Sequence, residues 1–307
     1  MRGAIGHGVT RTRAMTAAAA AGALLVGGLV FSACDGGSAD DGDGASPDAR
    51  RASEAAAPKQ QARGWNPRPD SIAAVGDSIT RGFDACSVLS DCPEVSWATG
   101  TDPVTKSLAG RLLDKPAGNS WNLAETGALT SDLPAQMKRA AAHEPELVTV
   151  MTGANDACRP TVGEMTPVDD FRADLERGMR TLREEQPRAQ VYMVSVPDLK
   201  RLWSQGRKNP VGTQVWKLGI CQSMLRDPDA MDKAAVQRRE QVYDRVVAYN
   251  SVLEDVCSKD RRCRYDGGAV FEYRFTGDEL SEWDWFHPSK QGQRTLAQLA
   301  YRRITAP

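Results

Sequence analysis

The stretch Ala73-Ala74-Val75-Gly76-Asp77-Ser78-Ile79-Thr80 indicates a buried strand that ends in a turn. Short, mostly apolar runs of this kind are typical of strands that are covered on both faces of a parallel sheet. Gly76 and Asp77 end the run with residues that favour turns. Ser78 therefore stands at the carboxyl end of the expected first strand, where open α/β sheets place their binding sites. Gly, Asp and Ser are ordinary turn residues, so this stretch alone does not decide a function.

Similar apolar runs recur along the chain. The segments expected to form strands are 72–76, 121–124, 147–152 and 191–196, with a weaker one at 264–266. Segments with helical spacing lie between them. After Thr166, a candidate helix cap, one such segment places apolar side chains at Phe171, Leu175, Met179 and Leu182.

A second helical series is carried by Val242, Val246, Tyr249, Leu253 and Val256. A third follows His287-Pro288 and carries Leu296, Leu299 and Ile304. Strands that alternate with helices predict a doubly wound, mostly parallel sheet between two helical layers. The expected fold class is therefore a three-layer α/β/α sandwich.

Residues 1–33 are typical of an export signal rather than of a folded domain. Arg2, Arg11 and Arg13 precede an Ala-, Gly-, Leu- and Val-rich run that ends at Ser32-Ala33-Cys34. Residues 1–33 contain no acidic residue. Small residues before a cysteine are similar to a bacterial lipoprotein cleavage site, which implies a lipidated Cys34. An uncleaved signal anchor and plain cleavage near Ala33 stay open. We expect an exported protein, held at the outer face of the cell membrane by its lipid anchor or secreted.

Residues 34–67 are rich in Asp, Gly, Ala and Pro and predict a disordered tether. The segment 68–304 is long enough for one domain with a full core, which we expect to be a monomer. Removing three signal arginines from the 39 basic residues leaves 36, against 40 acidic residues. This slightly acidic balance gives no footprint for nucleic acid.

The chain has seven cysteines, and setting Cys34 aside leaves six. In an oxidising compartment six cysteines can form three disulfides, with fifteen possible connectivities. We favour Cys86–Cys92, Cys158–Cys221 and Cys257–Cys263, because the outer pairs are close in sequence and lie in expected loops. The alternative is a metal site. The sequence has no Cys-x-x-Cys and only three histidines, so we expect none.

Three later segments form a set with the stretch around Ser78. They are Asn122-Leu123-Ala124-Glu125-Thr126-Gly127, Gly153-Ala154-Asn155-Asp156 and Asp284-Trp285-Phe286-His287-Pro288. In order and spacing the four segments resemble the motifs of the SGNH (GDSL-type) ester hydrolases. The resemblance covers about residues 68 to 304 and implies an α/β/α, flavodoxin-like fold and ester hydrolysis. The chain has no Gly-x-Ser-x-Gly, no P-loop and no dinucleotide-binding Gly-x-Gly-x-x-Gly, and we expect no cofactor.

Hydrolysis of an ester by serine needs a base that takes the hydroxyl proton and a group that orients this base. His7 lies in the signal segment and His143 at an expected surface helix end, which leaves His287 as the candidate base for Ser78. Asp284 precedes His287 by three residues, a spacing that lets its carboxylate reach Nδ1 in a tight turn. The sequence therefore predicts Ser78, His287 and Asp284 as the catalytic set.

The resemblance also assigns the donors of an oxyanion hole. They are the backbone N–H groups of Ser78 and Gly127 and the side-chain amide of Asn155. Asp77 and Asp156 are expected in supporting roles, orienting their loops through hydrogen bonds from side chain to backbone.

The segment 198–232 does not fit the alternation of strands and helices and is long for a plain connection. We expect an insertion that forms either a lid of the active site or a structural cover over the sheet edge. Its Trp203 and Trp216, with Trp283, Trp285 and Phe286 beside the base, could line an acyl pocket or simply pack the lid.

The substrate is the least specific inference from the sequence. The context around 95–100 is similar to the phospholipase B-like branch of the family, which favours lipid or phospholipid acyl esters as substrates. A carbohydrate acetyl esterase of the same fold is one alternative. A surface lipoprotein that binds a small ligand without catalysis is the other.

Overall fold

The computed structural model of the chain describes residues 64–306. Their centre is a five-stranded sheet of β1 (Ile72–Gly76), β2 (Ser120–Asn122), β3 (Leu147–Met151), β4 (Gln190–Met193) and β5 (Cys263–Tyr265). All neighbouring strands run parallel, in the order β2-β1-β3-β4-β5. The proposed signal, tether and Cys34 lie outside the described residues. In residues 64–306 no helix is long and apolar enough to cross a membrane.

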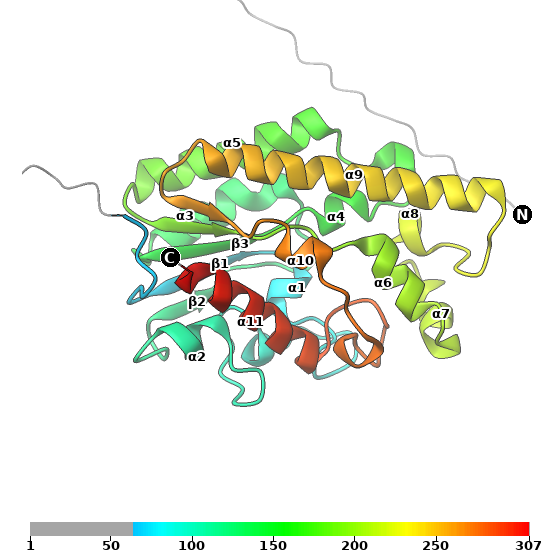
Figure 1. The fold of residues 1–307 in the computed structure, drawn as a ribbon, viewed down its shortest axis with the longest axis horizontal. Coiled ribbons are helices and arrows are strands. Elements are labelled where there is room, and N and C mark those ends of the chain that lie inside the picture. Colours follow the sequence, from blue (N-terminus) through cyan, green and yellow to red (C-terminus); the bar gives the residue numbers. More distant parts are fainter. Residues whose placement is uncertain (1–63, 307) are drawn as a thin grey trace, which may run out of the picture. The chain divides into compact units, whose positions relative to one another are not determined.

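Helices cover both faces of the sheet (Figure 1). One layer consists of α3 (Leu133–Ala141), α5 (Val168–Glu185) and α9 (Lys233–Ser258). The opposite face carries α2 (Leu108–Leu112), α10 (Ala269–Glu272) and α11 (Lys290–Thr305). This arrangement confirms the doubly wound α/β/α sandwich expected from the alternation of strands and helices.

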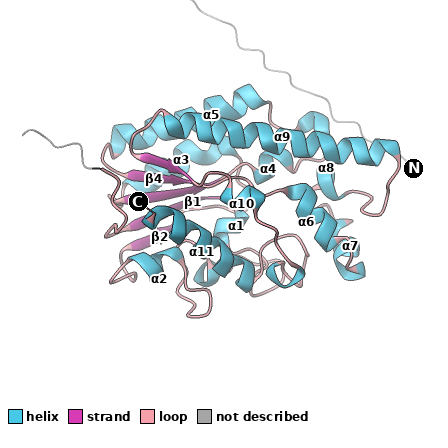
Figure 2. Cartoon of the chain, viewed as in Figure 1, coloured by secondary structure: helices cyan, strands magenta, loops and turns pink. Residues whose placement is uncertain are grey.

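The remaining helices are short and gather where the strands end (Figure 2). They are α1 (Ser78–Arg81), α4 (Ala154–Ala157), α6 (Leu199–Gly206), α7 (Pro210–Trp216) and α8 (Gln222–Leu225). Single turns of 3₁₀ helix lie at Pro93–Val95, Thr130–Asp132, Val162–Glu164 and Gly277–Glu279. The expected insertion 198–232 thus contains three short helices before α9 begins.

The core has the composition that a sheet covered on both faces requires. Every residue of β1 and β3 is buried, and the expected helical faces pack against them. In α5 the buried side chains include Phe171, Leu175, Met179 and Leu182, as the spacing predicted. The expected cap at Thr166 is wrong. Pro167 occupies the N-cap position without a side-chain hydrogen bond, and the Thr166 carbonyl instead accepts the hydroxyl of Tyr249.

Candidate active site

Ser78 is held at the end of β1 by a turn that requires glycine. Gly76 has a φ of 139°, and a Cβ there would lie 2.0 Å from the backbone oxygen of Met151. Asp77 caps the short helix α1, because its Oδ1 accepts the N–H of Ile79 at 3.0 Å. Ser78 is therefore the first residue of α1. It is 5% exposed, and its side chain borders a cavity.

His287 and Asp284 lie in the turn before α11 and reach back toward Ser78. Asp284 Oδ1 accepts the backbone N–H groups of Phe286 and His287, each at 2.9 Å. The other carboxylate oxygen, Oδ2, lies 2.5 Å from His287 Nδ1, and His287 Nε2 lies 2.9 Å from Ser78 Oγ. The three residues predicted from the sequence therefore form one hydrogen-bonded chain. It joins Ser78 to His287, which are 209 positions apart in the sequence.

The charges of this chain support a base at His287. Burial opposes the charge of Asp284, but His287 and the backbone N–H donors hold the pKa of Asp284 below its usual range. Burial would also lower the pKa of His287, yet the carboxylate of Asp284 outweighs it and raises that pKa. A carboxylate on Nδ1 fixes the tautomer in which Nε2 can accept a proton from Ser78.

The residues of the three expected oxyanion donors, Ser78, Gly127 and Asn155, all border this cavity. Gly127 follows β2 with a φ of 84° and has nothing within 4 Å of the position of a Cβ. Asn155 follows β3 in α4, and its Nδ2 donates one hydrogen bond to the carbonyl of Ala128 at 3.0 Å. The second Nδ2 hydrogen of Asn155 is therefore available to a ligand.

The two supporting carboxylates bond to backbone N–H groups. Asp77 accepts from Ile79, and Asp156 Oδ2 accepts both the N–H and the hydroxyl of Thr130, each at 3.0 Å. Both are buried, and burial raises the pKa of Asp77 to about 7 and raises that of Asp156. Each also has one buried oxygen, Asp77 Oδ2 and Asp156 Oδ1, that accepts no hydrogen bond from any residue within 64–306.

The cavity beside Ser78 has a volume of about 270 Å³ and a mainly apolar lining. Part of its wall comes from residues that the sequence did not single out: Phe83, Leu199, Leu202, Val270, Phe275 and Leu280. No local motif marks these side chains, since they come from separate elements. Among the five aromatics considered from the sequence, Phe286 lines the cavity. Trp203 and Trp216 are buried in the packing of the insertion, and Trp283 is 38% exposed.

The insertion is joined to the loops that carry the site. A disulfide links Cys158, just after α4, to Cys221, just before α8, and both cysteines line the cavity. Trp216 Nε1 donates to the carbonyl of Asp284 at 2.7 Å. A Cβ on Gly206 would lie 2.4 Å from the backbone oxygen of Trp285, so this contact requires glycine.

The other two cysteine pairs favoured from the sequence are also bonded. They are Cys86–Cys92 and Cys257–Cys263. Among residues 64–306, two clusters have donor atoms close enough for a metal ion. One is Cys86 and Cys92 with Glu94, where the two sulfurs are already bonded to each other. The other is Asp84 with Asp284 and His287, whose ring nitrogens already bond Asp284 and Ser78.

Comparison with known proteins identifies the family. The family model of GDSL-like lipases and acylhydrolases matches residues 72–300. The chain belongs to this family, and it is a hydrolase. No match was found among curated protein sequences.

Several solved structures are similar to this chain at low sequence identity. A GDSL-like lipase from Parabacteroides merdae is 16% identical, with a TM-score of 0.50 over 79% of this chain and 99% of that one. An acetylxylan esterase from Geobacillus stearothermophilus is 17% identical, with a TM-score of 0.44 over 78% of this chain and 95% of that one. The lipase Lip_vut3 from a goat rumen metagenome is 15% identical, with a TM-score of 0.45 over 75% and 94%.

Proposed function

We propose that this protein is a serine hydrolase of carboxylic esters that forms an acyl-enzyme on Ser78. The observation that carries the proposal is the chain from Ser78 Oγ through His287 to Asp284, which opens onto an apolar cavity. His287 Nε2 takes the proton of Ser78 Oγ as this oxygen attacks the ester carbonyl, and the proton then passes to the leaving alcohol. Water then attacks the acyl-enzyme. His287 takes the proton of the water and gives it to Ser78 Oγ as the acid leaves.

The negative charge that develops on the carbonyl oxygen needs donors placed in advance. The backbone N–H groups of Ser78 and Gly127 and the amide of Asn155 supply them in this proposal. Removing one such donor typically lowers turnover by about 100- to 1000-fold. A protein that only bound a ligand would have no need of this complete set.

The lining of the cavity favours a substrate with an acyl chain over an acetyl ester. An acetyl group would leave most of a 270 Å³ apolar cavity without contact, whereas burial of a longer chain contributes about 0.8 kcal/mol per CH₂. We propose lipid or phospholipid acyl esters as the substrate class. Carbohydrate acetyl esters are the alternative.

A fluorophosphonate probe tests the chemistry, and a series of esters tests the substrate. We expect the probe to label Ser78, and the labelling and turnover to disappear in Ser78→Ala while the protein stays folded. Label on another serine would overturn the mechanism. With p-nitrophenyl esters from acetate to palmitate, we expect kcat/KM to rise beyond acetate. A maximum at acetate would favour the carbohydrate acetyl esterase.

We also propose that the enzyme is exported and anchored through a lipid on Cys34. The support is the pattern of residues 1–34. Three disulfides agree with an oxidising compartment.

A further inference from the structure

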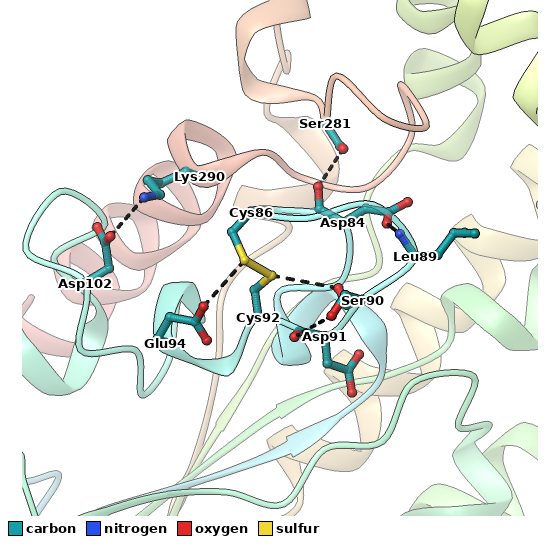
Figure 3. Close-up of a disulfide and its surroundings, with 10 residues drawn as sticks. All are labelled: Asp84, Cys86, Leu89, Ser90, Asp91, Cys92, Glu94, Asp102, Ser281 and Lys290. Atoms are coloured by element: carbon teal, nitrogen blue, oxygen red, sulfur yellow. Dashed lines mark hydrogen bonds and ion pairs between the residues drawn. A yellow bond between two sulfur atoms is a disulfide. The ribbon is translucent and has the colours of Figure 1, made fainter.

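Asp84 is a buried carboxyl group in the loop between α1 and the 3₁₀ turn Pro93–Val95. It is 1% exposed, although Leu89 in the same loop is 71% exposed. The Cys86–Cys92 disulfide closes this loop, and Asp84 Oδ1 accepts the N–H of Leu89 at 2.5 Å (Figure 3). Asp84 has a φ of 55°, a left-handed conformation that costs energy for a residue with a side chain. The loop thus fixes a strained, buried acid.

The same loop contacts the turn that carries His287. Ser281 Oγ donates to the backbone carbonyl of Asp84 at 2.6 Å (Figure 3), and the Ser281 N–H donates to the carbonyl of His287 at 2.8 Å. A carboxyl oxygen of Asp84, one of Asp284 and a ring nitrogen of His287 all lie within 4.8 Å of one another. Asp84 itself does not line the cavity beside Ser78.

Two buried carboxyl groups at this distance do not both ionise readily, so one of them keeps a proton. Hydrogen bonds decide which one. Asp284 accepts three N–H donors, from Phe286 and twice from His287. Asp84 accepts one, from Leu89. The better-solvated charge therefore lies on Asp284, and Asp84 is the carboxyl group that holds its proton to the higher pH. Burial and the charge of Asp284 raise the pKa of Asp84 to about 6.

We propose that Asp84 is a positioning residue of the hydrolase, which in its neutral form donates its O–H to the carboxylate of Asp284. The proposal rests on the proposed function of Ser78 and His287. It extends the chain of hydrogen bonds from Ser78 through His287 and Asp284 by one member. When Asp84 loses its proton, a second negative charge develops beside His287 and favours the protonated imidazole, which cannot act as a base.

Other charged groups also face this site. Asp77, from the N-terminus of α1, acts on His287, and Asp156, from α4, acts on Asp77. Both stay unchanged in the variants below. A difference between variant and wild type therefore reports on Asp84.

The test compares Asp84→Asn with Asp84→Ala. Asparagine keeps the acceptor for Leu89 and a donor for Asp284 but cannot ionise. We expect its kcat at neutral pH to stay within about threefold of wild type, and the acidic limb of its kcat/KM profile to move about one unit lower. Alanine loses the donor. Below about pH 6, where the pKa of Asp84 leaves its carboxyl group protonated, we expect kcat to fall about 10- to 100-fold with KM unchanged, because the loss is one of orientation.

Ser281→Ala is the matched control, since it removes the other bond between the two loops and leaves the carboxyl group in place. We expect it to lower the unfolding temperature without moving the acidic limb. An Asp84→Asn profile identical to wild type would overturn the proposal, whether or not Asp84→Ala folds. So would an Asp84→Ala enzyme that is folded and has the kcat of wild type below about pH 6, where the pKa of Asp84 leaves it protonated. Activity that persists in Ser78→Ala would instead overturn the proposed function itself.

Discussion

The two carboxylate oxygens of Asp284 have different roles, because Oδ1 holds the turn and Oδ2 contacts His287 Nδ1. A single substitution separates these two roles. In Asp284→Asn, Oδ1 can still accept the backbone N–H groups of Phe286 and His287, so the turn is retained. The amide then presents a donor to His287 Nδ1, which selects the tautomer whose Nε2 carries the proton and cannot accept one from Ser78. We expect kcat to fall about 10⁴-fold with little change in the unfolding temperature. A fall of less than tenfold would contradict the orienting role of Asp284.

Asp77 makes the stability of the fold depend on pH. Its pKa rises from 3.8 to about 7 on burial, so between these values the folded chain keeps a proton that the unfolded chain releases. Stability from this group is therefore full below about pH 4 and decreases up to about pH 7. Asp77→Asn keeps the cap on Ile79 and cannot ionise. We expect it to be more stable than wild type at pH 8, by on the order of 2 kcal/mol, and equal at pH 4.

Denaturant unfolding of Asp77→Asn and Asp77→Ala at the two pH values separates the charge from the cap. Alanine lacks the cap, so we expect it to lose about 1 kcal/mol relative to asparagine at both pH values. If asparagine is not more stable than wild type at pH 8, the raised pKa of Asp77 is wrong.

The residues of the candidate site could be picked out from the sequence because each lies in a local motif at a strand end or a helix start. Ser78 and Asn155 each follow a glycine by two residues, and His287 directly precedes a proline. Asp84 and the cavity wall could not be predicted in this way. Asp84 gains its meaning only from Asp284, 200 residues away, and Leu202 or Phe275 look like any core residue.

At the scale of elements, the sequence left the role of the insertion 198–232 open between a lid of the active site and a structural cover. The insertion forms part of the cavity wall through Leu199 and Leu202 of α6 and through residues 219–221, which lie between α7 and α8. The Cys158–Cys221 disulfide spans 63 residues, against six for Cys257–Cys263. Because closing a longer loop removes more entropy from the unfolded chain, the first bond should stabilise by about 4 kcal/mol and the second by about 2 kcal/mol.

Replacing each pair by serine tests whether the insertion serves the site. In the Cys158→Ser, Cys221→Ser variant we expect kcat/KM for long-chain esters to fall further than for acetate, because the wall of the acyl cavity is released. The Cys257→Ser, Cys263→Ser variant is the matched control. This pair lies where β5 begins, outside the cavity lining, and we expect full activity in the folded protein. Equal chain-length profiles in both variants would contradict a role for the insertion in substrate binding.

Strand positions were predicted well and strand ends less so. The expected run 191–196 ends as a strand at Met193, and 121–124 begins at Ser120 and ends at Asn122. Residues beyond these ends remain apolar and buried, as Val194 and Val196 do, so hydrophobicity alone does not mark where pairing stops.

The arrangement of the whole sheet accounts for the position of the site at the carboxyl ends of the strands. In the order β2-β1-β3-β4-β5, the chain first passes from β1 to one side and then crosses to the other. The ends of β1 and β3 are therefore neighbours at the point where the direction reverses, which is where ligands bind in open α/β sheets. Ser78 follows β1 and Asn155 follows β3. Alternation of elements predicts parallel strands but not this order, since order depends on which side each crossover takes.

The described chain begins at the opposite end of the sheet. Trp65 Nε1 donates to the carbonyl of Ile304 near the end of α11, and the Asn66 N–H donates to the side chain of Gln190, the first residue of β4. Residue 64, where the described chain begins, therefore lies away from Ser78. Changes at the proposed lipid site should alter where the enzyme is held and not how fast it works on a soluble ester.

Cys34→Ser tests this separation in the expressing cell. We expect the enzyme to leave the membrane fraction or to stay unprocessed, because serine offers no thiol for the lipid. We also expect kcat/KM for a soluble p-nitrophenyl ester to equal that of wild type, since every residue of the proposed site lies within residues 64–306. Fractionation, the mass of the N-terminal peptide and turnover are measured on the same preparations. An unchanged membrane fraction together with an unchanged N-terminal mass would show that Cys34 is not the anchor.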